Sequence, residues 1–218
     1  MSSDLLRNLV LTLVPMVLSL TIHEFAHAWV ATKLGDDTPD RQGRLTLSPL
    51  DHIDVVGTLL IPAMSVIWGG FGFIGWARPV QRNPANIRRD VTMRTGTILV
   101  AAAGPLSNLL LALGSLGALA ILAKVGVPPT PAGSAGVYFA ESMFAVNVGL
   151  FVLNMLPIPP LDGSRLLPRS MDDWVASVSR YSWIILLIII NVSVTRYYLL
   201  ELPNRAIRGL LLSMFGFA

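Results

Sequence analysis

Two histidines and a glutamate stand within five residues of one another near the start of this sequence. His23 and His27 are four residues apart, and Glu24 directly follows the first of them. In a helix, this spacing places both imidazoles on the same face, one turn apart. Two imidazoles placed in this way can bind one Zn²⁺, and a carboxylate beside them can take a proton from a water that the ion activates. The spacing therefore predicts zinc-dependent hydrolysis, with His23 and His27 as ligands and Glu24 as general base.

The motif lies inside an apolar run, residues 5–34, and the whole chain is apolar. Of its 218 residues 53% are hydrophobic and only 13% are charged, and the mean hydropathy is +0.64. This composition indicates an integral membrane protein with several spans, in which an ionisable residue costs at least about 2.5 kcal/mol and usually has a task. The first run resembles a signal peptide only superficially, because it is too long and carries the motif, so we expect it to be retained. The net charge of +3 comes with no aromatic-rich basic patch, so no nucleic acid is expected as a partner.

A catalytic zinc site usually has three protein ligands, so a third ligand is needed. The sequence has no cysteine and only one further histidine, His52, so the candidates are His52 and the acids. Asp162 is the best of them, because it follows a membrane span in a proline-rich turn just before Gly163. An Asp-Gly turn at a helix end is common on its own, but beside the histidine pair we predict that Asp162 completes the site. We expect one Zn²⁺ per chain.

The pattern of apolar runs predicts the elements that position these residues. Residues 55–75 contain Pro62 and a glycine-rich end, which favours a broken or re-entrant segment. The spans are predicted at residues 5–34, 97–124, 137–157 and 182–200, with a short apolar tail, 206–218, at the interface.

The charges of the predicted loops indicate how the chain is oriented in the membrane. Residues 76–96 are rich in arginine and residues 125–136 carry no charge, so the first loop is expected in the cytoplasm and the second outside. Asp162 then returns to the cytoplasmic side, and His23 and His27 must meet it there. We therefore expect a multi-pass protein of the plasma or inner membrane whose active site faces the cytoplasm, with residues 55–75 entering and leaving on one face.

Three motifs resemble those of the site-2 protease family of intramembrane zinc metalloproteases, in particular its small bacterial members without a PDZ domain. They are His-Glu-Phe-Ala-His at 23–27, Gly-Pro-Leu-Ser-Asn at 104–108, and the stretch from Asn154 to Leu-Asp-Gly at 161–163. The resemblance implies the same zinc ligands and general base, and close helix packing at 104–108. It also implies that Asn154 lies near the metal and binds substrate or its oxyanion. Ser164 departs from the family's second glycine, a change that we expect to be tolerated.

Three weaker features leave alternatives open. Asn108 is expected either to contact substrate or to join two helices by a hydrogen bond. Residues 44–48 alternate polar and apolar side chains, which predicts a short β-hairpin, either a plain surface hairpin or an edge strand that pairs with substrate. His52 is either an interfacial hydrogen-bonding residue, a gate or an extra ligand.

The sequence therefore predicts one membrane-embedded domain, 1–218, in an all-α polytopic fold. It has a three-helix metalloprotease core, about 5–165, and C-terminal helices at 174–218, with the re-entrant or broken segment and the short hairpin added. The predicted function is hydrolysis of peptide bonds within or near transmembrane segments of single-span membrane proteins. The alternatives are a membrane protein that binds or transports metal without hydrolysis, and a catalytically idle relative that binds membrane helices.

Overall fold

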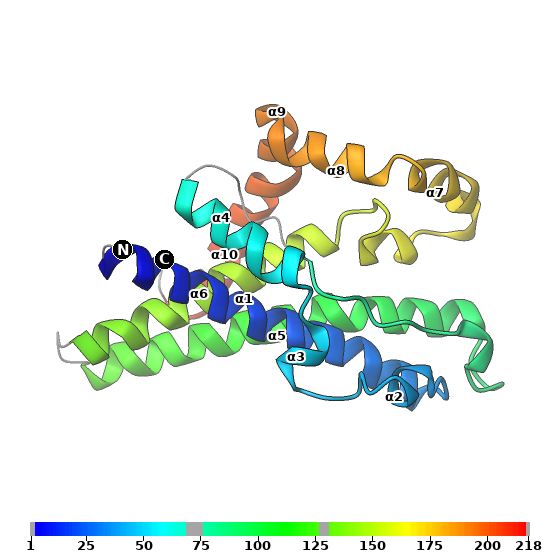
Figure 1. Cartoon of the computed structure of the whole chain (residues 1–218), viewed down its shortest axis with the longest axis horizontal. Helices are drawn as coiled ribbons and strands as arrows, with labels where there is room; N and C mark the ends of the chain where they lie inside the picture. The colour runs from blue at the N-terminus through cyan, green and yellow to red at the C-terminus, as the bar shows by residue number, and fades with distance from the viewer. Residues whose placement is uncertain (1–2, 69–75, 127–130, 217–218) are drawn as a thin grey trace.

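Three long helices form the centre of the structure, a computed structural model that describes residues 3–68, 76–126 and 131–216. They are α1 (Ser3–Lys33), α5 (Met93–Val125) and α6 (Pro131–Asn154), and they run side by side (Figure 1). Each contains an apolar stretch long enough to cross a membrane, of 29, 33 and 21 residues respectively. At 1.5 Å per residue the shortest of these reaches about 30 Å, which matches the hydrocarbon core of a bilayer.

Buried contacts between these helices fix their directions. Near the end of α1, Ala31 packs against Val100 in the early part of α5. Further back along α1, Met16 and Leu20 pack with Val146 of α6, and the chain just after α6 reaches α1 again at His27, where Asp162 lies 3.0 Å away. The helices α1 and α6 are therefore parallel to each other and antiparallel to α5, so the chain that follows α6 returns to the end of the molecule where α1 stops.

The predicted hairpin at 44–48 is wrong, since no strand occurs in the residues that the structure describes. The polypeptide there connects two short helices, α2 (Thr38–Arg41) and α3 (Pro49–His52). Local contacts bend it back on itself: the Arg44 guanidinium donates to the carbonyl of Asp51, and a ring nitrogen of His52 bonds the carbonyl of Thr46. An alternating pattern of polar and apolar side chains forms a strand only where a second strand can pair with it. Here, side-chain bonds to backbone carbonyls bend the chain instead.

The segment expected to re-enter the membrane is helical in its described part. The π-helix η1 (Val55–Leu60) continues into α4 (Ile61–Trp68), and residues 69–75 lie outside the described residues. These fourteen helical residues reach only about 21 Å. The chain is back beside its starting point at Trp76, whose N–H donates to the carbonyl of Gly57 and whose carbonyl accepts from Thr58 Oγ1. The two ends of the segment therefore lie side by side, as a re-entrant segment requires.

The C-terminal part is more broken than the sequence suggested. After η3 (Asp162–Leu166) and η4 (Arg169–Met171), α7 (Asp172–Ser179) is bent by 82° from α8 (Ser182–Asn191). The single span predicted at 182–200 is wrong, because α8 ends at Asn191 and the extended Val192 separates it from α9 (Ser193–Arg196). Side-chain bonds of Asn191 and Thr195 to carbonyls of α8 accompany this break. The π-helix η5 (Tyr197–Glu201) and α10 (Leu202–Met214) follow, and α10 packs on α6.

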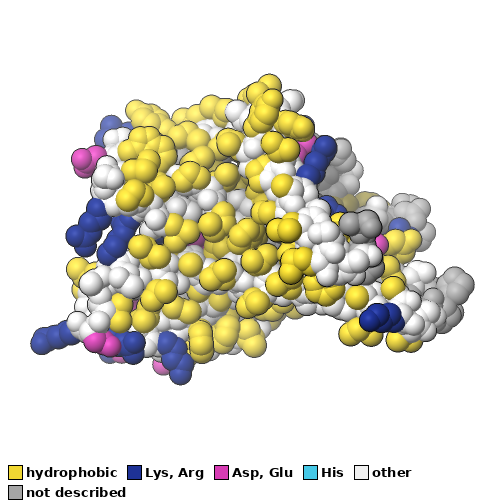
Figure 2. Space-filling model, turned by 180° about the vertical axis from the view of Figure 1, so that it is seen from behind, with side chains coloured by type: hydrophobic (Ala, Val, Ile, Leu, Met, Phe, Trp, Pro, Cys, Tyr) yellow, Lys and Arg dark blue, Asp and Glu magenta, His cyan; other side chains and the backbone are white. Residues whose placement is uncertain are grey.

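The outer surface fits a lipid environment. Figure 2 shows hydrophobic side chains over the broad middle of one face, with lysine and arginine gathered mainly toward its ends. Among the exposed large side chains are Leu106 and Leu110 of α5 and Ile184 and Leu187 of α8. An exposed apolar surface of this extent indicates a membrane protein.

Candidate metal centre

The two histidines of α1 point from one face of the helix toward the start of η3. His23 and His27 are 4% and 5% exposed, and their Nε2 atoms lie 3.1 Å apart. The long helix supplies this arrangement directly, since side chains four residues apart meet on one face. Two imidazole nitrogens are thereby presented to one point inside the protein.

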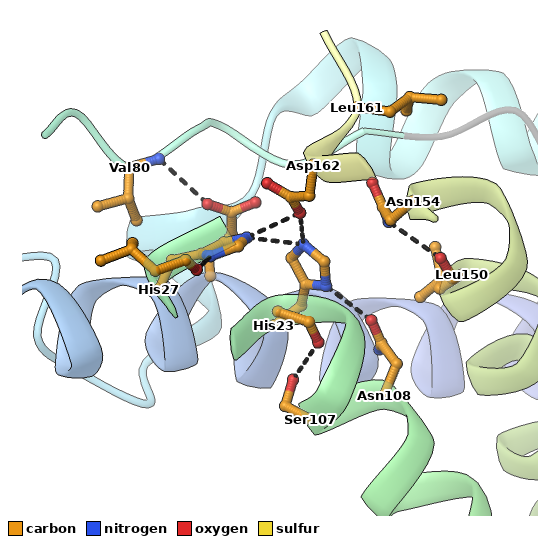
Figure 3. Close-up of polar contacts among 12 residues, drawn as sticks. His23, His27, Val80, Ser107, Asn108, Leu150, Asn154, Leu161 and Asp162 are labelled. Atoms are coloured by element: carbon orange, nitrogen blue, oxygen red, sulfur yellow. Dashed lines mark hydrogen bonds and ion pairs between the residues drawn. The ribbon is translucent and has the colours of Figure 1, made fainter. Parts of the chain in front are cut away.

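Asp162 joins them from the turn that follows α6. Its Oδ2 atom lies 3.0 Å from His27 Nε2 and 3.2 Å from His23 Nε2 (Figure 3). The turn is folded tightly onto the end of α6, because a Cβ on Gly163 would collide with the backbone carbonyls of Met155 and Leu156. Glycine at 163 therefore allows the close approach that brings the neighbouring carboxylate to the histidines.

A chain of buried amides behind the site determines which nitrogen of His23 carries its proton. It begins at Asn147 of α6, which is fully buried. Asn147 Nδ2 lies 2.8 Å from the carbonyl of Met143 and 2.8 Å from Ser19 Oγ, whose own proton goes to the carbonyl of Pro15. A carbonyl can only accept, so the NH₂ group of Asn147 must face Met143 and Ser19. Its oxygen then faces the other way.

The direction of the remaining bonds follows. Asn147 Oδ1 accepts from Asn108 Nδ2 at 2.9 Å, so Asn108 turns its Oδ1 toward His23 Nδ1, 2.6 Å away (Figure 3). That oxygen can only accept, so His23 Nδ1 carries the proton. The Nε2 atom of neutral His23 is then left with its lone pair facing the centre.

His27 is held in the same tautomer by a simpler contact. Its Nδ1 atom lies 2.6 Å from the backbone carbonyl of Val100 in α5, which can only accept a hydrogen bond. Neutral His27 therefore also presents a lone pair at Nε2. Metal-binding histidines commonly donate their second nitrogen to a carbonyl or carboxylate in this way.

The donor set fits a cation. Three lone-pair donors, from His23, His27 and Asp162, lie within 4.8 Å of one another and are all buried. Without a positive charge between them, two imidazole lone pairs and a carboxylate would repel one another in a poorly solvated interior. A tetrahedral Zn²⁺ with bonds of about 2.0–2.1 Å separates its ligand atoms by about 3.3 Å, close to the separations among these three residues. The nitrogen and oxygen donors suit zinc, and three protein ligands leave one position for a water or substrate.

Gly104 of α5 lies directly against the imidazoles. A Cβ at this position would overlap Nε2 of His27 and the ring of His23. The glycine therefore lets α5 approach α1 closely enough for Asn108 and Val100 to reach the two Nδ1 atoms. This is the close packing that the motif at 104–108 implied.

Glu24 is held by an extended segment, residues 76–82, that crosses the site. Its Oε2 atom accepts the backbone N–H of Val80 at 3.1 Å (Figure 3). The same segment is anchored two residues earlier, where the N–H of Arg78 donates to the carbonyl of His52. Glu24 is 9% exposed, and within the described chain no hydrogen-bond donor reaches its second carboxylate oxygen. One oxygen is thus fixed while the other stays available to exchange a proton.

Three further residues that the sequence singled out lie outside the group of candidate metal ligands. Asn108 is fully buried with both ends of its amide bonded inside the protein, which favours the alternative in which it joins two helices, and its substrate contact stays a prediction. Asn154 lies half-buried beside Asp162 and donates to the carbonyl of Leu150, and its substrate contact stays a prediction (Figure 3). His52 is buried, bonds the carbonyl of Thr46 and is not part of the metal-ligand group, which favours the structural alternative.

Sequence reasoning missed the residues that support the site from behind. Asn147 is an amide within an apolar helix, the same signal that singled out Asn108 and Asn154, and Ser19 lies one helical turn before His23. The extended segment 76–82 was interpreted only as a basic loop. The contact of its Val80 N–H with Glu24 depends on tertiary structure and has no local signal.

Comparison with known proteins identifies the family. The chain is 38% identical, over 98% of its length and 93% of the relative's, to the Bacillus subtilis protein named "Putative zinc metalloprotease YwhC". The chain belongs to the site-2 protease family. Its zinc metalloprotease relatives also include proteins named Rip2: it is 34% identical to one from Mycolicibacterium smegmatis and 35% identical to one from Mycobacterium tuberculosis. These matches cover 71% of the chain and 54% of each relative.

Two further comparisons gave no match. No family model matches the sequence, and no solved structure matches it. The assignment of this site-2 protease family member therefore rests on its curated relatives.

Proposed function

We propose that this family member is an intramembrane zinc endopeptidase that hydrolyses peptide bonds within or near the transmembrane segments of single-span membrane proteins. The convergence of His23, His27 and Asp162 between apolar helices is the observation that carries this proposal. The family relationship supports zinc as the metal and hydrolysis as the chemistry.

The basic loop supports an active site that faces the cytoplasm of a multi-pass protein. Residues 76–96 carry five arginines and one acid, and this loop joins α4 to the start of α5, at the end of the molecule where the metal ligands meet. By the rule that positive loops stay inside, that end is cytoplasmic. Water would then reach the site from that side.

Each step of the proposed reaction uses groups already described. Bound zinc would polarise the substrate carbonyl and lower the pKa of a water. Glu24, with one oxygen held by Val80 N–H, takes a proton at the other oxygen and passes it to the leaving amine. A substrate helix must first unwind, because its carbonyls are hydrogen-bonded within the helix. Asn154, beside Asp162, is proposed to contact the unwound segment.

The test compares the wild type with Glu24→Gln on a single-span test substrate in lipid vesicles. The wild type should cleave it, and Glu24→Gln should keep its zinc and lose cleavage by several orders of magnitude. Glu141→Gln is the matched control, because Glu141 is an exposed acid of α6 with no contact to the ligands. Cleavage by purified Glu24→Gln would reject its role as base, and zinc flux across the vesicle without any peptide hydrolysis would favour the transport alternative.

A further inference from the structure

A cavity of about 570 Å³ adjoins the candidate metal centre at the end where α1 stops. Its walls include Val80 and Val100, whose backbone groups bond Glu24 and His27 respectively. The cavity therefore begins one residue away from the proposed general base and from a metal ligand. A polypeptide bound at the metal would extend into it on one side of the scissile bond.

The charged groups of this cavity are one acid and two bases: Asp36, Arg82 and Arg165. The carboxylate of Asp36 is already saturated, because it accepts hydrogen bonds from Thr38, Asn83 and Asn86. These bonds tie the turn after α1 to the segment that follows residue 82. Asp36 therefore supports the fold, and within the described residues no ion pair joins it to either arginine of the cavity.

Both arginines are left without an ion-pair partner. Within residues 3–68, 76–126 and 131–216, no carboxylate lies within 4.0 Å of the guanidinium of Arg82 or Arg165. Arg165 is exposed, but Arg82 is half-buried, and a partly desolvated guanidinium without a partner is unfavourable.

Arg82 also lies near the reactive groups. Burial lowers the pKa of Arg82, and the carboxylates of Asp162, Glu24 and Asp36 oppose that effect. Arg82 follows two residues after Val80, whose N–H binds Glu24, and both residues line the same cavity. Once Asp162 is bound to a divalent cation its charge is compensated, and the cavity is left positive.

We propose that this cavity is a substrate subsite for an acidic side chain, Asp or Glu, whose carboxylate is bound by Arg82, with Arg165 adding positive charge at the mouth. This inference rests on the proposed function and names a specificity determinant of the same site. A planar guanidinium binds a carboxylate through two parallel hydrogen bonds, and such charge-assisted bonds are about twice as strong as neutral ones. An amide at that substrate position would bind less well, and a lysine would be repelled.

The test moves a single glutamate along the substrate. Glutamate and glutamine are placed in turn at each of the five positions on either side of the scissile bond, and kcat/KM is measured with the purified full chain. At one position, or two adjacent ones, the wild type should cleave the glutamate substrate about tenfold faster than the glutamine substrate. Arg82→Gln should abolish this preference while keeping zinc, because kcat/KM should fall far more on the glutamate substrate than on the glutamine substrate. Arg82→Glu should instead prefer lysine there.

Arg89→Gln is the matched control, because Arg89 is an exposed arginine of the same loop outside the cavity. It should retain the tenfold preference. An equal loss on both substrates in Arg82→Gln, or no position where the wild type prefers glutamate, would overturn the proposal. A rate that follows anionic lipid content instead of substrate charge would also overturn it and would indicate a lipid headgroup site.

A binding measurement separates this proposal from the proposed function. Peptides with glutamate or glutamine at the chosen position are titrated onto zinc-loaded Glu24→Gln, with and without Arg82→Gln. A tenfold preference that Arg82→Gln removes would support the subsite even if the wild type cleaved nothing. Equal binding of both peptides would reject the subsite even if hydrolysis were established.

Discussion

Asn108 and Asn147, on neighbouring helices, are joined by a buried 2.9 Å hydrogen bond from Asn108 Nδ2 to Asn147 Oδ1. Both side chains are fully buried. Because the carbonyl of Met143 fixes the orientation of Asn147, this one bond sets the orientation of Asn108 and thereby the proton position on His23. Asn147, which does not touch the candidate metal ligands Asp162 or His27, thus determines which nitrogen of His23 carries the proton and which keeps its lone pair.

Asn147→Leu should therefore weaken zinc binding. Without Asn147 Oδ1, the amide of Asn108 is free to turn over and present its NH₂ group to His23 Nδ1, which would move the histidine proton to Nε2. We expect zinc affinity to fall about 10–100-fold, measured by competition with a chelator on folded, monodisperse protein.

Two controls separate this effect from a general loss of packing. Ser19→Ala should have a smaller effect, because Met143 still orients Asn147. Ser115→Ala removes a buried hydroxyl of α5 that donates to the carbonyl of Leu111 in its own helix, and it should leave zinc affinity unchanged. If Asn147→Leu bound zinc as tightly as Ser115→Ala, the amide chain would have no part in orienting His23.

Gly104→Ala should remove zinc binding almost completely. A methyl group at this position occupies the space of the His27 and His23 rings, so either α5 moves away or the rings rotate out of position. The metal content of the purified variant, measured by elemental analysis, checks this expectation.

Gly114→Ala is the control on the same helix, since a Cβ there meets nothing within 4 Å. It should retain its zinc and gain slightly in stability, because alanine favours a helix more than glycine does. Full zinc occupancy in Gly104→Ala would show that the close contact between α5 and the histidines is not required.

The sequence singled out the three residues that converge in the structure because their signals are local or nearly so. His23 and His27 need only a helix to meet, and Asp162 follows from the need for a third donor and from a turn that a glycine allows to fold tightly. The hairpin at 44–48 and the span at 182–200 failed for a physical reason. Alternation and hydropathy report which side chains avoid water, but not the side-chain bonds to carbonyls that bend the chain at Arg44 and Thr195.

The orientation of the histidines could not be predicted in the same way. It depends on Asn147 and on the carbonyl of Val100, which reach His23 and His27 only through the packing of three helices. Backbone groups such as the Val80 N–H carry no residue-specific signal at all, because every non-proline residue has one.

Asp36 should contribute stability that depends on pH. Burial disfavours its charged form, but hydrogen bonds from Thr38, Asn83 and Asn86 outweigh burial and hold the pKa of Asp36 below its usual 3.8. A lowered pKa stabilises the folded state above the unfolded pKa, and this contribution is lost as the pH falls through the folded pKa. Asp36→Asn should thus cost about 1–3 kcal/mol at pH 7 and progressively less below pH 3.8.

Thermal unfolding in detergent between pH 7 and pH 3 tests this dependence. Asp40→Asn provides the comparison, because Asp40 is an exposed acid of α2 a few residues away. The difference between the wild type and Asp36→Asn should be constant near neutral pH and shrink in acid, whereas Asp40→Asn should follow the wild type. A difference that grew with acidity would contradict a lowered pKa for Asp36 in the folded protein.

The zinc content of Asp162→Ala tests the central claim most directly. In detergent-purified protein, the wild type and Glu24→Gln should each contain one zinc per chain, and Asp162→Ala should contain almost none while remaining folded. A full equivalent of zinc in folded Asp162→Ala would contradict the account, because the metal would then not be held jointly by α1 and the turn after α6.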